Sequence, residues 1–131
     1  MSPRTTASKS PRAFAEFLAH LSEHSALGSA HMLKGYQALR PSLADFAAEM
    51  AACTVPALII SGDEDEPCLD ASLMLKRCIP SAGLVFPPQT GHACKLEEPS
   101  LFNAAGERFF HQVESGQYRL RDPRAAGTRM L

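Results

Sequence analysis

The part of this sequence that most restricts its fold lies between residues 54 and 86, where two short apolar runs flank a helical pattern. The first run, Thr54 to Ile60, is rich in β-branched and aliphatic residues, which is typical of a strand buried on both faces. It stops at Ser61-Gly62, and the second run is Leu84-Val85-Phe86. Between them we predict a helix over residues 70–78 and a turn over 79–83. The sequence therefore predicts one β-α-β unit, with two parallel strands and a right-handed crossover.

A helical layer is predicted before this unit, over residues 13–52. Apolar residues recur there with the spacing of one helix face, first over 13–24, then over 30–39, and again after Ser42, which is the predicted N-cap of a third helix. Pro41 separates the last two helices, because the residue before a proline avoids the helical region. We expect four larger side chains of this layer to face the core: Met32, Tyr36, Phe46 and Met50.

The remaining segments complete the predicted organisation. Pro99 opens a last helix with Phe102, Ala105, Phe109 and Val113 along one stripe, so residues 53–114 form a β-α-β-α unit. Residues 115–131 turn polar and predict a loose tail. Residues 1–12 are polar and basic; they predict a disordered end, with an organelle transit peptide as the alternative.

Composition excludes several classes of partner. The 131 residues carry 13 basic and 14 acidic side chains, and a net charge of -1 gives no reason to expect nucleic acid or an anionic membrane. No apolar run approaches the ~20 residues of a membrane-spanning helix. The four cysteines form no Cys-x-x-Cys pair, and we expect them to be reduced, mostly buried side chains of a cytoplasmic protein. The sequence predicts no cofactor and no metal.

An acidic loop and a histidine follow the two predicted strands. Asp63 and Asp65 lie in the loop after the first strand, and His92 follows the second strand after a short Pro-Pro extension. The carboxyl ends of parallel strands meet at one edge of the sheet, where catalytic groups gather. A carboxylate there can fix the tautomer of an imidazole, whose other nitrogen then withdraws a proton from a nucleophile. The pattern indicates an acid–base pair.

Three segments carry a resemblance to a known family: PALIISGDEDEP over residues 56–67, LKRCIP over 75–80 and TGHACKLEEPSLFN over 90–103. Together with the last helix, they resemble the final two strands and closing helix of α/β-hydrolases, over residues 54–113. The helices of 13–52 resemble, more loosely, the end of that family's cap region. The resemblance implies a partial α/β-hydrolase fold in which Asp65 is the acid of a catalytic triad and His92 its base. Asp63 is the alternative acid, and one or two cap residues are expected to line a substrate pocket.

The sequence departs from the family at the nucleophile. The family order places a Gly-x-Ser-x-Gly serine before the acid, and the 131 residues contain no such motif and no HGGG-like segment for an oxyanion hole. We therefore expect a C-terminal fragment of a serine hydrolase for a small ester or related carbonyl substrate, inactive by itself. Whether the chain is an enzyme, and whether the missing nucleophile is Ser or Asp, stays open.

The same missing half suggests an alternative of another class. A two-stranded sheet leaves one edge of its first strand unpaired, and such an edge pairs with other chains by strand addition. The chain would then be a non-catalytic interaction module, forming a homo-oligomer or binding a complementing chain.

The four other histidines require an interpretation. His20 and His24 belong to an H-x-x-E-H pattern, which supplies two zinc ligands on one helix face in some metallopeptidases. Leu18 and Leu21 mark the same segment as an ordinary amphipathic helix, and we favour that interpretation. We expect His31 at the surface and His111 near the C-terminal carbonyls of the last helix.

Overall fold

The computed structural model describes residues 7–127, and its centre is a two-stranded parallel sheet. Strand β1 (Ala57–Ile60) pairs with β2 (Ala82–Val85), with Ala57 opposite Ala82 and Ile60 opposite Val85. Helix α5 (Glu66–Cys78) connects the two strands. The predicted β-α-β unit and the mixed α/β class are confirmed. The first strand begins three residues later than predicted, and the second begins two residues earlier, within the predicted turn.

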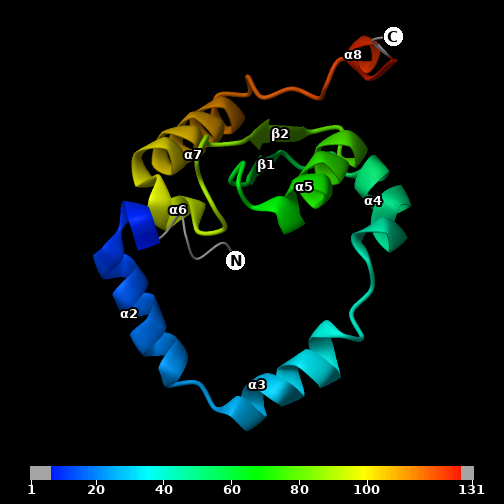
Figure 1. Ribbon diagram of the computed structural model, residues 1–131. Coiled ribbons are helices and arrows are strands. Elements are labelled where there is room, and N and C mark those ends of the chain that lie inside the picture. Colours follow the sequence, from blue (N-terminus) through cyan, green and yellow to red (C-terminus); the bar gives the residue numbers. More distant parts are fainter. Residues whose placement is uncertain (1–6, 128–131) are drawn as a thin grey trace.

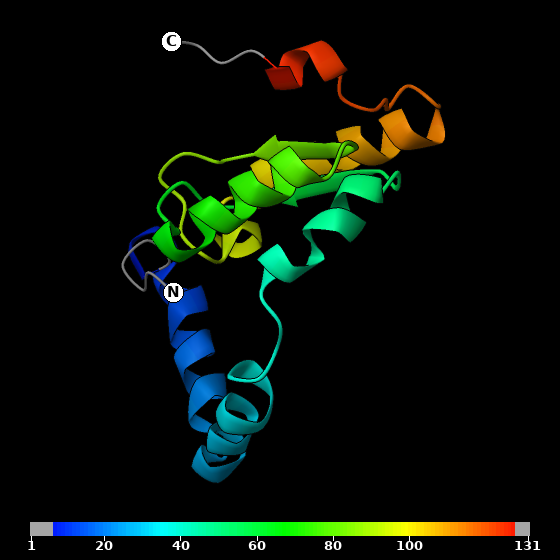
Figure 2. The same cartoon turned by 90° about the vertical axis from the view of Figure 1, so that its right-hand side faces the viewer.

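Helices cover both faces of this sheet. Helix α5 lies on one face and α7 (Pro99–Glu114) lies on the other, after the short helix α6 (Cys94–Glu97), as Figures 1 and 2 show. Helix α5 starts four residues earlier than predicted, because Pro67 falls in its first turn, where a proline costs no hydrogen bond. The expectation of strands buried on both faces is wrong for most positions. Apart from Ala82, the strand residues are only half-buried, since each strand has a single neighbour.

The N-terminal helices form an arm outside the sheet layers. Helices α2 (Pro11–Ser22) and α3 (Ala26–Met32) extend away from the sheet, and the chain returns beside α5 (Figure 1). A wide π-helical turn, η1 (Leu33–Gln37), continues α3, and the returning part consists of the 3-10 helix η2 (Leu43–Phe46) and α4 (Ala47–Ala52). The predicted cap at Ser42 is confirmed: its hydroxyl accepts from the Ala44 N–H, and Asp45 completes a capping box.

The expectation that this layer faces the core is wrong. Met32 is 57%, Tyr36 59% and Phe46 43% exposed, and only Met50 is half-buried. The helical periodicity places apolar residues on one face correctly, but the arm lies away from the sheet, so that face has little to pack against (Figure 2).

The segment after α7 is not the loose tail that its polarity predicts. The Tyr118 hydroxyl donates to the Ala57 carbonyl over 3.0 Å, and the Tyr118 ring packs edge-on against Phe109. The Arg121 guanidinium donates to the carbonyls of Lys76 and Arg77 at the end of α5. A last helix, α8 (Pro123–Gly127), follows. Residues 115–122 thus return to the sheet, and residues 128–131 of the predicted tail lie outside the described residues.

The predicted disordered N-terminus also differs in part. Residues 1–6 lie outside the described residues, whereas residues 7–9 are helical and the Lys9 ammonium pairs with the Glu98 carboxylate. No helix within residues 7–127 is long and apolar enough to cross a membrane.

Candidate acid–base site

Two loops meet beyond the carboxyl ends of β1 and β2. Backbone and side-chain hydrogen bonds join them: the Glu64 N–H donates to the Thr90 carbonyl over 2.9 Å, and the Thr90 N–H donates to an Asp63 carboxylate oxygen over 3.0 Å. Thr90 is completely buried. The loop that follows β1 and the loop that carries His92 are therefore fixed to each other.

Gly62 makes this close approach possible. A Cβ atom at Gly62 would lie 2.1 Å from the Thr90 carbonyl oxygen and 2.2 Å from the Gly91 carbonyl oxygen. Both obstacles are backbone atoms, which cannot rotate away as a flexible side chain can. Only glycine fits at this position without moving the loops apart.

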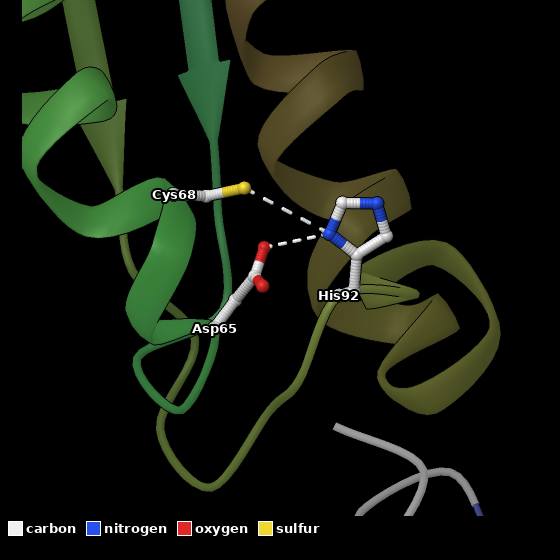
Figure 3. A group of neighbouring side chains, drawn as sticks. All are labelled: Asp65, Cys68 and His92. Atoms are coloured by element: carbon white, nitrogen blue, oxygen red, sulfur yellow. Dashed lines mark hydrogen bonds and ion pairs between the residues drawn. The ribbon is translucent and has the colours of Figure 1, made fainter. Parts of the chain in front are cut away.

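The structure brings Asp65 and His92 together, as the sequence predicts. His92 Nδ1 lies 2.8 Å from Asp65 Oδ2, and Figure 3 shows the other ring nitrogen pointing away from the carboxylate. Asp65 is only 4% exposed, whereas the His92 side chain is 54% exposed. The pair therefore consists of a buried acid that holds one nitrogen of an imidazole, with the other nitrogen directed outward.

The Asp65 carboxyl is held in its charged form. Its burial acts to raise the pKa, but hydrogen bonds with Cys68 and His92, and the electrostatic interaction with His92, together outweigh burial and lower the pKa from its ordinary value. An ionised Asp65 can accept a hydrogen bond from Nδ1–H, and in that tautomer the lone pair of the ring lies on the outer nitrogen.

Cys68 is the third member of this cluster, and sequence reasoning missed it. Its Sγ lies 3.8 Å from His92 Nδ1, on the side of the ring that faces Asp65 (Figure 3). The hydrogen bond to Asp65 raises the pKa of the Cys68 thiol, as do burial and the Asp65 charge. Cys68 is therefore a protonated thiol, and it does not lie at the outward nitrogen of His92, where a nucleophile would be activated. No pattern in the sequence marks an Asp-x-x-Cys at a helix start as a site.

Residues of α6 hold the loop that carries His92 in place. The Gly91 N–H donates to the Glu97 carboxylate over 2.8 Å, and Glu97 is 6% exposed. The buried Cys94 thiol lies 3.5 Å from the Gly91 carbonyl. These contacts fix the backbone immediately before His92. No sequence pattern pointed to Glu97, because α6 is too short to show a helical periodicity.

The alternative acid, Asp63, has a different role. Its carboxylate accepts from the Thr90 backbone, which lowers the Asp63 pKa, and it forms no hydrogen bond with His92. The structure therefore pairs His92 with Asp65.

The other histidines do not form a comparable site. Helix α2 ends at Ser22, so His24 falls outside the helix and the i, i+4 geometry of the H-x-x-E-H pattern is lost. Within residues 7–127, the only group of three or more potential metal ligands close together is Asp65, Cys68 and His92. His31 and His111 are exposed in the last turns of α3 and α7.

The burial of the four cysteines agrees only in part with the expectation. All four are free, in agreement with the expectation, but only Cys94 is buried, and Cys53, Cys68 and Cys78 are half-buried.

A separate groove lies between the arm and α5. It has a volume of about 770 Å³, and its lining includes Tyr36, Phe46 and Met74. His92 is not among its lining residues.

Comparisons with known proteins give no relative: no protein-family model, no curated protein and no solved structure matches this chain.

Proposed function

We propose that this chain is the acid–base part of an α/β-fold serine hydrolase, with Asp65 as the orienting acid and His92 as the general base. One observation carries the proposal. His92 Nδ1 lies 2.8 Å from the buried Asp65 carboxylate, where two parallel strands end, and the second ring nitrogen points outward. The resemblance of residues 54–113 to the last strands and closing helix of that family supports it.

The pair would act by moving one proton. Asp65 accepts a hydrogen bond from Nδ1–H, so the lone pair of His92 lies on Nε2. Nε2 removes the proton from a nucleophilic hydroxyl, and the nearby carboxylate stabilises the imidazolium that results. Nε2 then returns the proton to the leaving alcohol. The exposure of the ring gives a second protein segment access to Nε2.

A second segment is required because the sequence contains no Gly-x-Ser-x-Gly motif. A strand of that second segment would pair with β1. The outer edge of β1 is available for such pairing: Ala57 and Ser61 donate their N–H groups toward β2, and alternation directs those of Leu58 and Ile60 the other way. The described residues contain no other strand. By itself the chain is expected to hydrolyse no ester, because loss of a triad member costs about 10⁴-fold or more in rate.

Complementation tests the proposal. The chain is co-expressed with the core half of an α/β-fold serine hydrolase. This half supplies the nucleophile elbow, and its own segment with the triad acid and base has been removed. Labelling of that serine by a fluorophosphonate probe reports its activation. We expect this chain to restore labelling, and His92→Ala to abolish the restoration. His111→Ala is the matched control, because His111 is exposed on α7 and should leave labelling unchanged.

Two results would contradict the proposal. Restoration that persists in the His92→Ala variant would show that the imidazole is not the base. Heat-sensitive labelling of this chain itself would show that it contains its own nucleophile.

The unpaired edge of β1 favours a second candidate function, a non-catalytic module that pairs with a second copy or another chain by strand addition. Leu58→Pro removes an N–H at that edge and leaves the β1–β2 hydrogen bonds in place. Light scattering after size-exclusion chromatography should show an oligomer that this variant disrupts and that Leu58→Ala preserves. A dispersed wild-type monomer at all concentrations would count against self-association through this edge.

A further inference from the structure

The atoms of the acid–base pair also belong to a cluster of potential metal ligands. Asp65, Cys68 and His92 each present one ligand atom, and these atoms all lie within 4.8 Å of one another. They come from the loop after β1, the first turn of α5 and the loop before α6 (Figure 3). We propose that this cluster binds a zinc ion through Asp65, Cys68 and His92 Nδ1, and that zinc binding switches off the acid–base pair.

The separations of the three atoms fit a tetrahedral zinc site. Bond lengths of about 2.3 Å to sulfur and about 2.0–2.2 Å to nitrogen and oxygen place tetrahedral ligand atoms roughly 3.3–3.6 Å apart. The sulfur to Nδ1 distance of 3.8 Å is close to this value. The Nδ1 to Oδ2 distance of 2.8 Å must open by about half an ångström, which a small rotation of the exposed His92 ring supplies. Asp65 and Cys68 are one helical turn apart, so a single rigid segment positions both.

The ligand chemistry favours zinc over harder cations. A thiolate with an imidazole selects zinc or other thiophilic transition metals, whereas calcium and magnesium prefer oxygen ligands alone. Three protein ligands leave the fourth position to water, and the 54% exposure of the His92 side chain shows that solvent reaches the cluster. The backbone that carries His92 is fixed by the Gly91 bond to Glu97, which limits the movement needed to form the site.

Zinc and the acid–base function exclude each other because both use Nδ1. In the free pair, Nδ1 carries the proton and Nε2 the lone pair. Zinc takes the lone pair of Nδ1, so the imidazole proton moves to Nε2, which can then no longer accept one. The Cys68 thiol loses its proton to solvent as the Zn–S bond forms, so one proton is released for each ion bound. No oxidation or reduction takes place.

Cobalt(II) provides a direct test, since it occupies zinc sites and its thiolate bond gives an intense near-ultraviolet charge-transfer band. The full chain is titrated with Co²⁺ under anaerobic, reducing conditions, and Zn²⁺ is then added. We expect the chain to bind one equivalent of Co²⁺ and to show the thiolate charge-transfer band and the visible bands of four-coordinate cobalt. Added Zn²⁺ should displace the Co²⁺ and abolish these bands. Cys68→Ser should lose the band and bind Zn²⁺ at least about tenfold more weakly. Cys78→Ser is the control, because it lies at the far end of the same helix.

The mutual exclusion is tested in the complementation assay and rests on the proposed function. Zinc should suppress fluorophosphonate labelling with the wild-type chain and much less with the Cys68→Ser variant, which keeps Asp65 and His92. His92→Asn provides a second variant that should also weaken Co²⁺ binding, and circular dichroism verifies its fold.

The outcomes separate the two ideas. A wild-type spectrum without the thiolate band, or Cys68→Ser binding as tightly as wild type, overturns the zinc site and leaves the acid–base proposal standing. Loss of binding in a His20→Ala, His24→Ala double variant would also overturn it. Cobalt binding as expected, with labelling that does not depend on His92, would instead contradict the acid–base function alone.

Discussion

Replacing Gly62 by alanine tests how the two loops of the site are held together. The new Cβ would lie 2.1 Å from the Thr90 carbonyl oxygen and 2.2 Å from that of Gly91. Ordinary contact between carbon and oxygen needs more than about 3 Å, so the loops must separate by roughly 1 Å. That movement lengthens the hydrogen bonds from Glu64 N–H to Thr90 and from Thr90 N–H to Asp63, which measure 2.9 and 3.0 Å.

The loss of stability comes from the steric overlap and from the two weakened hydrogen bonds. Overpacking a tight site costs about 1–3 kcal/mol, and each weakened hydrogen bond adds about 1 kcal/mol. We therefore expect Gly62→Ala to lower the free energy of unfolding by about 3–5 kcal/mol and to disturb the bond between Asp65 and His92. Gly106→Ala is the matched control. Gly106 lies inside α7 with no atom near its Cβ position, so alanine there should stabilise by about 0.5–1 kcal/mol.

Urea denaturation followed by far-ultraviolet circular dichroism measures both variants, and ¹⁵N spectra of the histidine ring report the tautomer of His92. The two Gly→Ala changes should alter the free energy of unfolding in opposite directions. If Gly62→Ala were as stable as wild type and kept the Nδ1–H tautomer, the close approach of the loops would not be a constraint, and the account of Gly62 would be refuted.

Three further predictions concern single hydrogen bonds. The folded chain lowers the Asp65 pKa from its ordinary value, so its contribution to stability is present above the ordinary pKa and is lost as the pH falls through the lowered pKa. Asp65→Asn should therefore be less stable than wild type at neutral pH and lose less stability on acidification, as measured in urea titrations at several pH values. Tyr118→Phe removes the bond to the Ala57 carbonyl and should cost about 1 kcal/mol in the same assay, whereas Tyr36→Phe, at an exposed position, should cost nothing measurable. Ser42→Ala removes the cap of η2 and should cost about 1 kcal/mol with a small loss of helical dichroism; an unchanged stability would contradict the capping role.

Local patterns predicted the centre of the fold well. Residues that favour strands, a helical stretch between them and Gly or Pro at the boundaries specify a β-α-β unit from short-range chemistry alone. Once the strands are parallel, the loops after them must meet at one edge of the sheet, so the proximity of Asp65 and His92 followed from the order of elements.

The errors lie where distant segments decide burial. The periodicity of residues 13–52 predicted amphipathic helices correctly, but it could not show that the arm lies away from the sheet with Met32 and Tyr36 exposed. The polarity of residues 115–122 suggested a loose tail, because no local pattern shows that the Tyr118 hydroxyl reaches a carbonyl of β1 or that Arg121 caps α5.

The sequence alone thus determined the elements of the α/β unit and the two loops that carry an acid and a histidine, because propensity and periodicity act over a few residues. Only the tertiary structure decided that Asp65 and not Asp63 bonds His92, that Asp63 instead fixes Thr90, and that Cys68 joins the pair. Those choices depend on ångström distances between segments more than twenty residues apart, which the residue pattern of either segment does not contain.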